Sequence, residues 1–171
     1  MWSMRAARKG AGFTLIELLI VIGIISVLAA IIFVAVDPAR RFAEARNAQR
    51  WSEANAVLNS ILKCTVDNNG TLPSALGSAT ATPNVFRMIG NGTDFSGCTA
   101  QATTEMLNLR SSNCEGSTYL VPDYLAQLPV DPSGGTWTQA RTGYYIVRTS
   151  AGRITIGACT PERSETISVT R

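Results

Sequence analysis

The sequence contains no histidine among its 171 residues. Histidine is the side chain most often used as a general base and as a metal ligand. The most frequent kinds of acid–base active site and of metal site are therefore excluded. The sequence also has no phosphate-binding glycine loop, no paired-carboxylate motif and no Cys-x-x-Cys spacing. A cysteine nucleophile would need an activating base that the sequence does not supply. We therefore expect neither an enzyme nor a bound metal or other cofactor.

An excess of one charge is also missing, once the first twelve residues are set aside. Three basic side chains of that leader, Arg5, Arg8 and Lys9, equal the whole formal net charge of +3, and the remaining basic and acidic side chains cancel. A chain without net charge is poorly suited to bulk electrostatic binding of nucleic acid. We expect no nucleic-acid partner.

A long apolar run follows the leader and extends from Phe13 to Val36. Its 24 residues include 17 Leu, Ile, Val or Phe and a single charge, Glu17. A helix of this length reaches about 36 Å, which is enough to span the apolar core of a membrane. The apolar side chains contribute about 5–10 kcal/mol to insertion, more than the cost of about 2.5–3.5 kcal/mol for a central carboxylate. We expect this helix to enter a membrane.

Glu17 needs an explanation, because acids inside membrane helices usually have a charged partner. A cut after Gly12 would give Phe13 a free α-amine four residues before Glu17, on the same helix face. A neighbouring copy of the chain could offer its own amine instead. The plainer alternative is an anchor helix whose acid reaches the membrane surface.

The residues around this position resemble the leader of type IV pilins and their pseudopilin relatives. The match consists of Lys9, Gly12, Phe13, Thr14, Leu15, Ile16 and Glu17, directly before the apolar run. The resemblance implies that a membrane-embedded prepilin peptidase cuts between Gly12 and Phe13 and methylates the amine of Phe13, which stays charged. It also implies that Glu17 pairs with the N-terminus of a neighbouring copy in a helical filament, built by an assembly platform and an ATPase.

An ordinary secretory leader is the alternative way of processing this N-terminus. It also has a basic start and an apolar core, and Val27-Leu28-Ala29 could serve as a weak cleavage site. That route would place Glu17 inside the hydrophobic region and leave Gly12 without a role. The peptidase motif and the cysteines favour a single pass with the N-terminus inside, although the charges flanking the run are equivocal.

Four cysteines lie beyond the apolar run: Cys64, Cys98, Cys114 and Cys159. An even number in an exported domain predicts two disulfides, although free buried thiols are the alternative and three pairings are open. We favour Cys98–Cys114, which closes a short loop. The other bond is then Cys64–Cys159, which would tie the end of a long helix to the C-terminal strands.

Helical patterning continues through residues 37–66. Asp37 is a good N-cap and Pro38 fits the first position of a helix, so either a second helix begins here or one long helix breaks in a kink at Pro38. Apolar residues then recur on one face: Trp51, Ala54, Leu58 and Ile61, with Val57 and Leu62 beside them. The opposite face carries polar side chains: Arg46, Arg50, Glu53 and Asn59.

Four arginines form the only basic cluster of the sequence: Arg40, Arg41, Arg46 and Arg50. The cluster follows the apolar run directly and would be covered in a filament, which argues against a role in DNA uptake. We expect these arginines to contact lipid headgroups or to pair with nearby acids, namely Asp37, Glu44 and Glu53.

The rest of the chain changes character twice. Residues 67–118 are rich in Thr, Ser, Gly, Asn and Ala, which predicts a variable loop region with one short helix at Gln101–Leu109. Residues 119–171 carry strand signals at 144–149, 153–159 and 166–170, and a weaker one at 119–121. We expect three or four antiparallel strands packed on the helical stripe, an α+β layer. With the leader 1–12 and the membrane helix 13–36, this is the order of elements that the pilin fold implies.

A short segment, Leu128-Pro129-Val130-Asp131-Pro132, resembles one in major pseudopilins of secretion systems, where the following loop holds calcium. Here Ser133-Gly134-Gly135 follows, and no acidic cluster appears before Glu162. Calcium takes about six to eight oxygen ligands, usually with several carboxylates. We expect a proline-bounded turn and no metal.

The sequence therefore predicts a structural subunit of a type IV pilus-like filament. The subunit would lie in the cytoplasmic membrane before assembly and in a cell-surface pilus afterwards. A pseudopilin of a type II secretion system, in a periplasmic pseudopilus, is the close alternative. A membrane-tethered enzyme or binding domain and a DNA-binding minor pilin are the other classes. Motility, adhesion, DNA uptake and secretion all share this subunit plan.

Overall fold

The computed structural model describes residues 12–77, 82–114 and 116–171. The predicted leader, with Arg5, Arg8 and Lys9, lies outside the described residues except for Gly12. The chain divides into two compact units, Met1–Arg41 and Phe42–Arg171. The second unit contains the sheet and the hydrophobic core.

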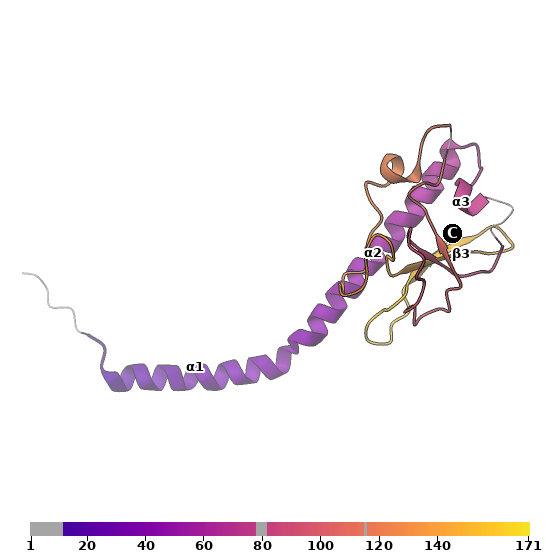
Figure 1. The fold of residues 1–171 in the computed structure, drawn as a ribbon. Helices are drawn as coiled ribbons and strands as arrows, with labels where there is room; N and C mark the ends of the chain where they lie inside the picture. The colour runs from indigo at the N-terminus through magenta and orange to yellow at the C-terminus, as the bar shows by residue number, and fades with distance from the viewer. Residues whose placement is uncertain (1–11, 78–81, 115) are drawn as a thin grey trace, which may run out of the picture. The chain divides into compact units, whose positions relative to one another are not determined.

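Helix α1 (Leu15–Val36) forms most of the first unit (Figure 1). Its side chains are predominantly apolar, and none of them is buried within the chain. The helix begins after Thr14, which caps it, and ends at Asp37, whose φ of 42° is left-handed. Helix α2 (Pro38–Asp67) begins at the next residue, and Asp37 Oδ1 accepts a hydrogen bond from the Arg40 amide at 3.3 Å. The two helices are therefore separate, and the interruption lies at Asp37.

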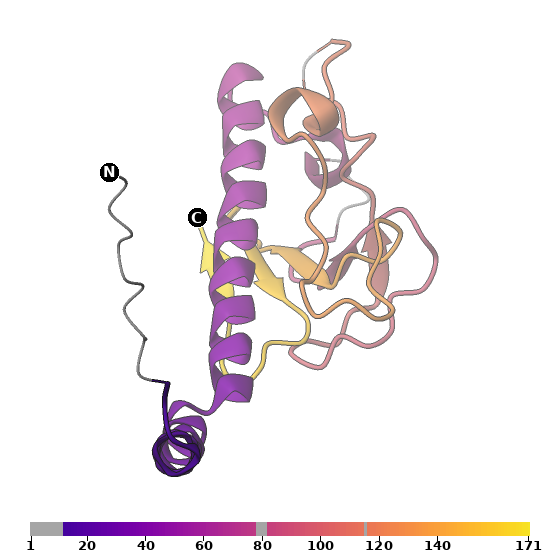
Figure 2. The ribbon, with the colours of Figure 1, turned by 90° about the vertical axis from the view of Figure 1, so that its left-hand side faces the viewer.

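Helix α2 packs on the domain along one face (Figure 2). Its buried residues recur at helical spacing: Asn47, Arg50, Ala54, Val57, Leu58, Ser60, Ile61 and Cys64. The apolar stripe predicted from Ala54 to Ile61 is confirmed. Trp51 is not part of it, because its side chain is 38% exposed and position 50 continues the buried spacing instead. Arg50, predicted on the polar face, is fully buried.

Five strands form one mixed sheet in the order β2-β1-β3-β4-β5. Three of them pair antiparallel and lie where strands were predicted: β3 (Tyr144–Arg148), β4 (Ile154–Ala158) and β5 (Ser168–Thr170). The other two lie in the predicted loop region: β1 (Arg87–Ile89) and β2 (Glu105–Leu107). The expected antiparallel strands are therefore confirmed. Strand β1 pairs antiparallel with β3 but parallel with β2, so the sheet as a whole is mixed, which was not predicted. The α+β class, with a long helix packed on a small sheet, is confirmed.

Two short elements differ from their predictions. The segment Gln101–Leu109, predicted as a helix, contains strand β2, because pairing with β1 and the burial of Leu107 outweigh local composition. The segment predicted as a strand at 119–121 instead leads into η1 (Leu120–Tyr124), a short irregular helical turn. A four-residue helix, α3 (Ser74–Gly77), follows α2.

The two faces of the sheet are covered differently. One face packs with α2 in the main core, to which it contributes Ile89, Leu107, Tyr144, Ile146, Ile154, Ile156 and Ala158. The opposite face buries a smaller cluster, Met88, Tyr145 and Cys159, which is covered by Phe86, Cys98, Met106 and Trp137. Successive residues of a strand thus point into two separate apolar clusters.

Candidate functional site

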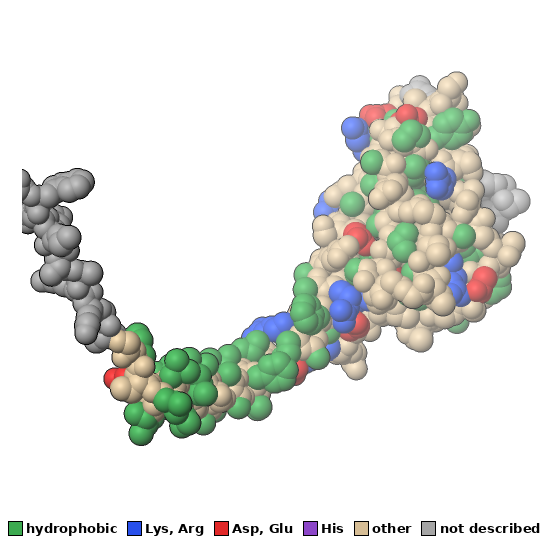
Figure 3. All heavy atoms as spheres, turned by 60° about the vertical axis from the view of Figure 1, so that its left-hand side comes forward, with side chains coloured by type: hydrophobic (Ala, Val, Ile, Leu, Met, Phe, Trp, Pro, Cys, Tyr) green, Lys and Arg blue, Asp and Glu red, His purple; other side chains and the backbone are tan. Residues whose placement is uncertain are grey.

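Helix α1 offers a long apolar surface. Hydrophobic side chains cover it in the space-filling view (Figure 3), and its large apolar residues are between 48% and 82% exposed. The helix is long and apolar enough to cross a membrane by length and composition. Its 22 residues correspond to about 33 Å. Because none of α1 is buried within the chain, lipid or another protein has to cover this surface in the cell.

The start of α1 is a capping box formed by Thr14 and Glu17. The Thr14 hydroxyl accepts a hydrogen bond from the Glu17 amide at 3.3 Å, and Glu17 Oε2 accepts one from the Thr14 amide at 2.9 Å. The Thr14 hydroxyl also donates to Glu17 Oε2 at 2.7 Å. The carboxylate is therefore folded back toward the start of the helix, where the unpaired amides of the first turn favour negative charge.

This geometry gives Glu17 a role in helix formation that the sequence reasoning missed. The signal was present, since Thr-x-x-Glu before an apolar run is the sequence pattern of a capping box. The same contacts hold the carboxylate against the amide of Thr14, the residue after Phe13. A new amine at Phe13 would therefore lie close to the Glu17 carboxylate. Pairing with the amine of a neighbouring copy stays a prediction.

Gly12 lies in open space in the part of the chain that the structure describes. A Cβ built at this position would meet no described atom within 4 Å. A glycine in open space is consistent with recognition by another protein. The cut between Gly12 and Phe13 stays a prediction.

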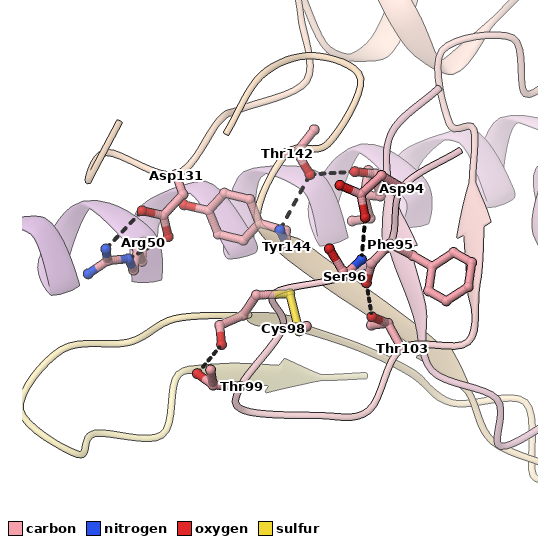
Figure 4. The surroundings of a disulfide bond; sticks show 12 residues. Arg50, Asp94, Phe95, Ser96, Cys98, Thr99, Thr103, Asp131, Thr142 and Tyr144 are labelled. Carbon is pink, nitrogen blue, oxygen red and sulfur yellow. Dashed lines mark hydrogen bonds and ion pairs between the residues drawn. A yellow bond between two sulfur atoms is a disulfide. The ribbon is translucent and has the colours of Figure 1, made fainter. Parts of the chain in front are cut away.

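A cluster of charged side chains is buried in the domain, where α2 meets the loop after η1 (Figure 4). Arg50 donates from Nε and Nη2 to the two carboxylate oxygens of Asp131, each at 2.8 Å, and neither side chain is exposed. Ser133 donates to Asp131 as well, from its amide at 2.9 Å and from its hydroxyl. Burial alone would raise the pKa of Asp131, but the bonds from Arg50 and Ser133 outweigh it and hold that pKa below its ordinary value.

Glu162 extends this cluster to the loop between β4 and β5. Its carboxylate accepts hydrogen bonds from Arg46 Nε and Nη2, the shortest at 2.8 Å, and lies 3.5 Å from Arg50 Nη1. Asn47 binds the backbone of the same loop, since its Nδ2 donates to the Glu162 carbonyl at 2.9 Å and its Oδ1 accepts from the Glu162 amide at 3.1 Å. The bonds from Arg46 lower the pKa of Glu162. One stretch of α2 thus fixes two loops.

These contacts correct the prediction for two arginines of the basic cluster. Arg46 and Arg50 pair with Glu162 and Asp131, which lie 116 and 81 residues further along the chain, rather than with the nearby acids. Glu53 instead accepts hydrogen bonds from Gln49 and from the Tyr144 hydroxyl. The sequence contained one signal for Arg50, because it lies four residues before Ala54 in the buried spacing. Nothing in the sequence indicated which acids would reach it.

Asp131 lies in the segment Leu128–Pro132, and its contacts show the structural role of that segment. Its carboxylate is taken up by Arg50 and Ser133, and Pro132 and Ser133 form a turn, as predicted. Among the residues that the structure describes, no three His, Cys, Asp or Glu side chains gather as a metal site would require. The aspartate therefore has a structural partner within the chain.

The four cysteines form two disulfides, Cys64–Cys114 and Cys98–Cys159, so the pairing that we favoured is wrong. Alternation along β4 explains why. Ile154 and Ile156 face α2, so Cys159 lies on the opposite face of the sheet, where Cys64 of α2 cannot reach it. Cys98 covers that opposite face. The alternation was visible in the sequence and could have excluded a bond between Cys64 and Cys159.

Comparison with known protein families adds evidence at the start of the chain. Residues 7–33 match the family described as the prokaryotic N-terminal methylation motif. No curated protein and no solved structure matches the chain. The matched residues include Gly12, Phe13, the capping box and most of α1, which is the exposed apolar part of the molecule. The chain thus carries the prepilin-type signal of type IV pilins and pseudopilins.

Proposed function

We propose that this protein is a pilin, a structural subunit of a type IV pilus-like filament. In this proposal a prepilin peptidase cuts between Gly12 and Phe13 and methylates the new amine. Helix α1 then holds the subunit in the cytoplasmic membrane, with the N-terminus inside, until an assembly platform and its ATPase extract it. The observation that carries the proposal is α1 itself, which starts within the methylation motif and has no buried residue.

The physical basis of assembly is exchange of one apolar environment for another. In the membrane, lipid covers the side chains of α1. In the filament, the same side chains pack against α1 of other copies, so the apolar area is not left in water at either stage. The domain from Phe42 onward has its own core and can stay folded throughout this exchange.

Glu17 sets the axial register of the filament in this proposal. Its carboxylate pairs with the methylated amine of Phe13 on a neighbouring copy. A neighbour that slipped along the axis would leave that charge buried without a partner, which is strongly unfavourable. The capping box supports this role, because it already directs the carboxylate toward the N-terminal end of α1.

A pseudopilin of a type II secretion system is the second candidate. Its support is the segment Leu128–Pro132, which resembles one in major pseudopilins. The two candidates differ in where the polymer lies, since a pilus extends from the cell surface and a pseudopilus stays in the periplasm. Electron microscopy of cells with and without the gene separates them. Surface fibres that disappear with the gene support a pilus.

The N-terminus of the mature protein tests the processing step. Mass spectrometry of the chain from cells that contain a prepilin peptidase should find N-methylated Phe13 as the first residue. A chain that still begins at Met1 would contradict the proposal. A chain that begins at Ala30, after a secretory cut, would also contradict it.

The charge of Glu17 is tested separately from its capping role. Glu17→Gln can still complete a capping box but has no charge, so it should be cut and held in the membrane while filament yield falls at least tenfold. Thr14→Val is the matched control, because it removes the capping hydroxyl and keeps the carboxylate, and it should still form filaments. Normal filaments from Glu17→Gln would contradict the proposal that the charge of Glu17 sets the axial register.

A further inference from the structure

The segment 91–103 is fixed on the face of the sheet opposite to α2 (Figure 4). Cys98 bonds to Cys159, and the amides of Thr99 and Ala100 donate to the Cys159 carbonyl at 3.1 and 2.9 Å. Within the segment, the Thr103 hydroxyl donates to the Phe95 carbonyl at 2.6 Å. A loop held at this many points presents its outward side chains in one arrangement.

Asp94, in this segment, meets Arg141 from the loop before β3. Arg141 Nη1 contacts Asp94 Oδ2 at 2.5 Å and donates to Ser96 Oγ at 3.2 Å, and its guanidinium carbon lies 5.0 Å from the centre of the Trp137 ring. Arg141 is therefore held in place by its contacts with Asp94, Ser96 and Trp137. The Asp94 side chain is 60% exposed, so its carboxylate keeps room for a further partner.

A hollow of about 350 Å³ lies beside this ion pair. Asp94 and Arg141 line it together with three threonines, Thr93, Thr136 and Thr138. Gly92 and Ala140 also line the hollow, and their backbones approach closely: the Gly92 amide donates to the Ala140 carbonyl at 2.9 Å, and a Cβ on Gly92 would come within 2.8 Å of that oxygen. A larger residue at position 92 would therefore shift one of these two backbones.

We propose that this hollow binds one sugar ring of an uncharged glycan. The carboxylate and the guanidinium give fixed acceptors and donors for vicinal hydroxyls, and the threonine hydroxyls can do both. The two charges cancel, so an ionic ligand gains no net attraction. Ala140 is the only apolar side chain in the lining, which gives a lipid or an aromatic ligand little area to bury. The volume falls in the range of sites for small molecules. The site lies in the domain and does not depend on assembly.

Saturation-transfer NMR on the full chain in detergent micelles tests this site, with glucose, galactose, mannose and N-acetylglucosamine as probes. At least one sugar should show transfer, and that signal should fall at least fivefold in Thr93→Val/Thr136→Val, which removes two exposed hydroxyls. Asp94→Asn should weaken the same signal. Thr71→Val is the matched control, because it makes the same change outside the hollow and should leave the signal intact.

Three results would overturn the proposal. The first is that none of the four sugars shows transfer. The second is a signal that persists unchanged in the double threonine variant, which places the sugar elsewhere. The third is displacement of the sugar by inorganic phosphate, which indicates an anion site instead. Thermal unfolding of each variant checks that the domain is intact, and if Asp94→Asn loosens the loop, the double threonine variant still decides the outcome.

Discussion

Helices α1 and α2 follow one another in the sequence but depend on different surroundings. Helix α1 has 22 residues, none of which is buried. Helix α2 buries a stripe of side chains, which supply much of the domain's core. An amphipathic helix finds its partner in its own chain, whereas a helix with apolar side chains on all sides needs one outside it. The sequence of α2 therefore determines packing within the domain, and the sequence of α1 determines a surface for contacts outside the chain.

The charged residue in each helix repeats this difference. Arg50 finds its counter-ion in the same chain, where Asp131 satisfies it with two hydrogen bonds. The hydrogen bonds that the Glu17 carboxylate accepts within the described part of the chain come from Thr14, which carries no charge. If the comparison holds, changes at Arg50 should affect the stability of one molecule, and changes at Glu17 should affect association between molecules.

The largest effect on stability is expected from Arg50→Ala. It leaves the Asp131 carboxylate buried without its partner, which should lower the free energy of unfolding of the domain by about 3–5 kcal/mol. Urea unfolding of the chain in detergent, followed by tryptophan fluorescence, measures this. The double variant Arg50→Met/Asp131→Leu should recover most of the loss, because it removes both charges. A loss below about 1 kcal/mol in the single variant would show that the ion pair is not needed by the domain.

The disulfides should have the next largest effect, and the two should differ. Replacing Cys64 and Cys114 by serine opens a loop with a sequence separation of 50 and should cost about 2–4 kcal/mol of unfolding free energy. Replacing Cys98 and Cys159 should mainly release segment 91–103 to limited proteolysis, because that bond lies outside the main core. Similar proteolysis of both variants would contradict the separation of the two faces. Non-reducing peptide mapping checks the pairing itself.

The features that the sequence predicted correctly are those that nearby residues determine. The signal at Gly12–Glu17, the apolar run and the stripe from Ala54 to Ile61 are local patterns, so they could be read directly. Strands β3, β4 and β5 were also found, because β-branched and aromatic residues mark them. Their positions follow from nearby residues alone.

What the sequence did not predict depends on contacts between distant residues. Strands β1 and β2 have three residues each, too few for a period, and they exist because they pair with neighbours. The partner of Arg50 lies 81 residues away, and several acids were equally plausible by sequence. The hollow beside Asp94 combines residues about 47 positions apart. Only the fold brings such residues together.

Acid should weaken the domain by less than Arg50→Ala does, because protonation neutralises the buried carboxylate rather than leaving it charged. The folded-state pKa values of Asp131 and Glu162 lie below their ordinary values. Their stabilisation is therefore present above about pH 5 and lost as pH falls below about 4. Urea midpoints between pH 7 and pH 3 should fall less steeply in Glu162→Gln than in the wild type. Equal slopes for the variant and the wild type would contradict the assignment.

The smallest effect is expected from Thr14→Val, and it sharpens the comparison most. The variant removes the capping hydroxyl, which should destabilise the first turn of α1 by about 1 kcal/mol. Hydrogen exchange in detergent should speed up at the amides of Glu17 and Leu18, which donate to the Thr14 hydroxyl and carbonyl, by roughly fivefold, which corresponds to about that free energy. The urea midpoint of the domain should not change, because α1 contributes no buried residue to its core. A shift in that midpoint would mean that α1 and the domain stabilise each other, and the division into an outward-directed helix and a self-sufficient domain would then be wrong.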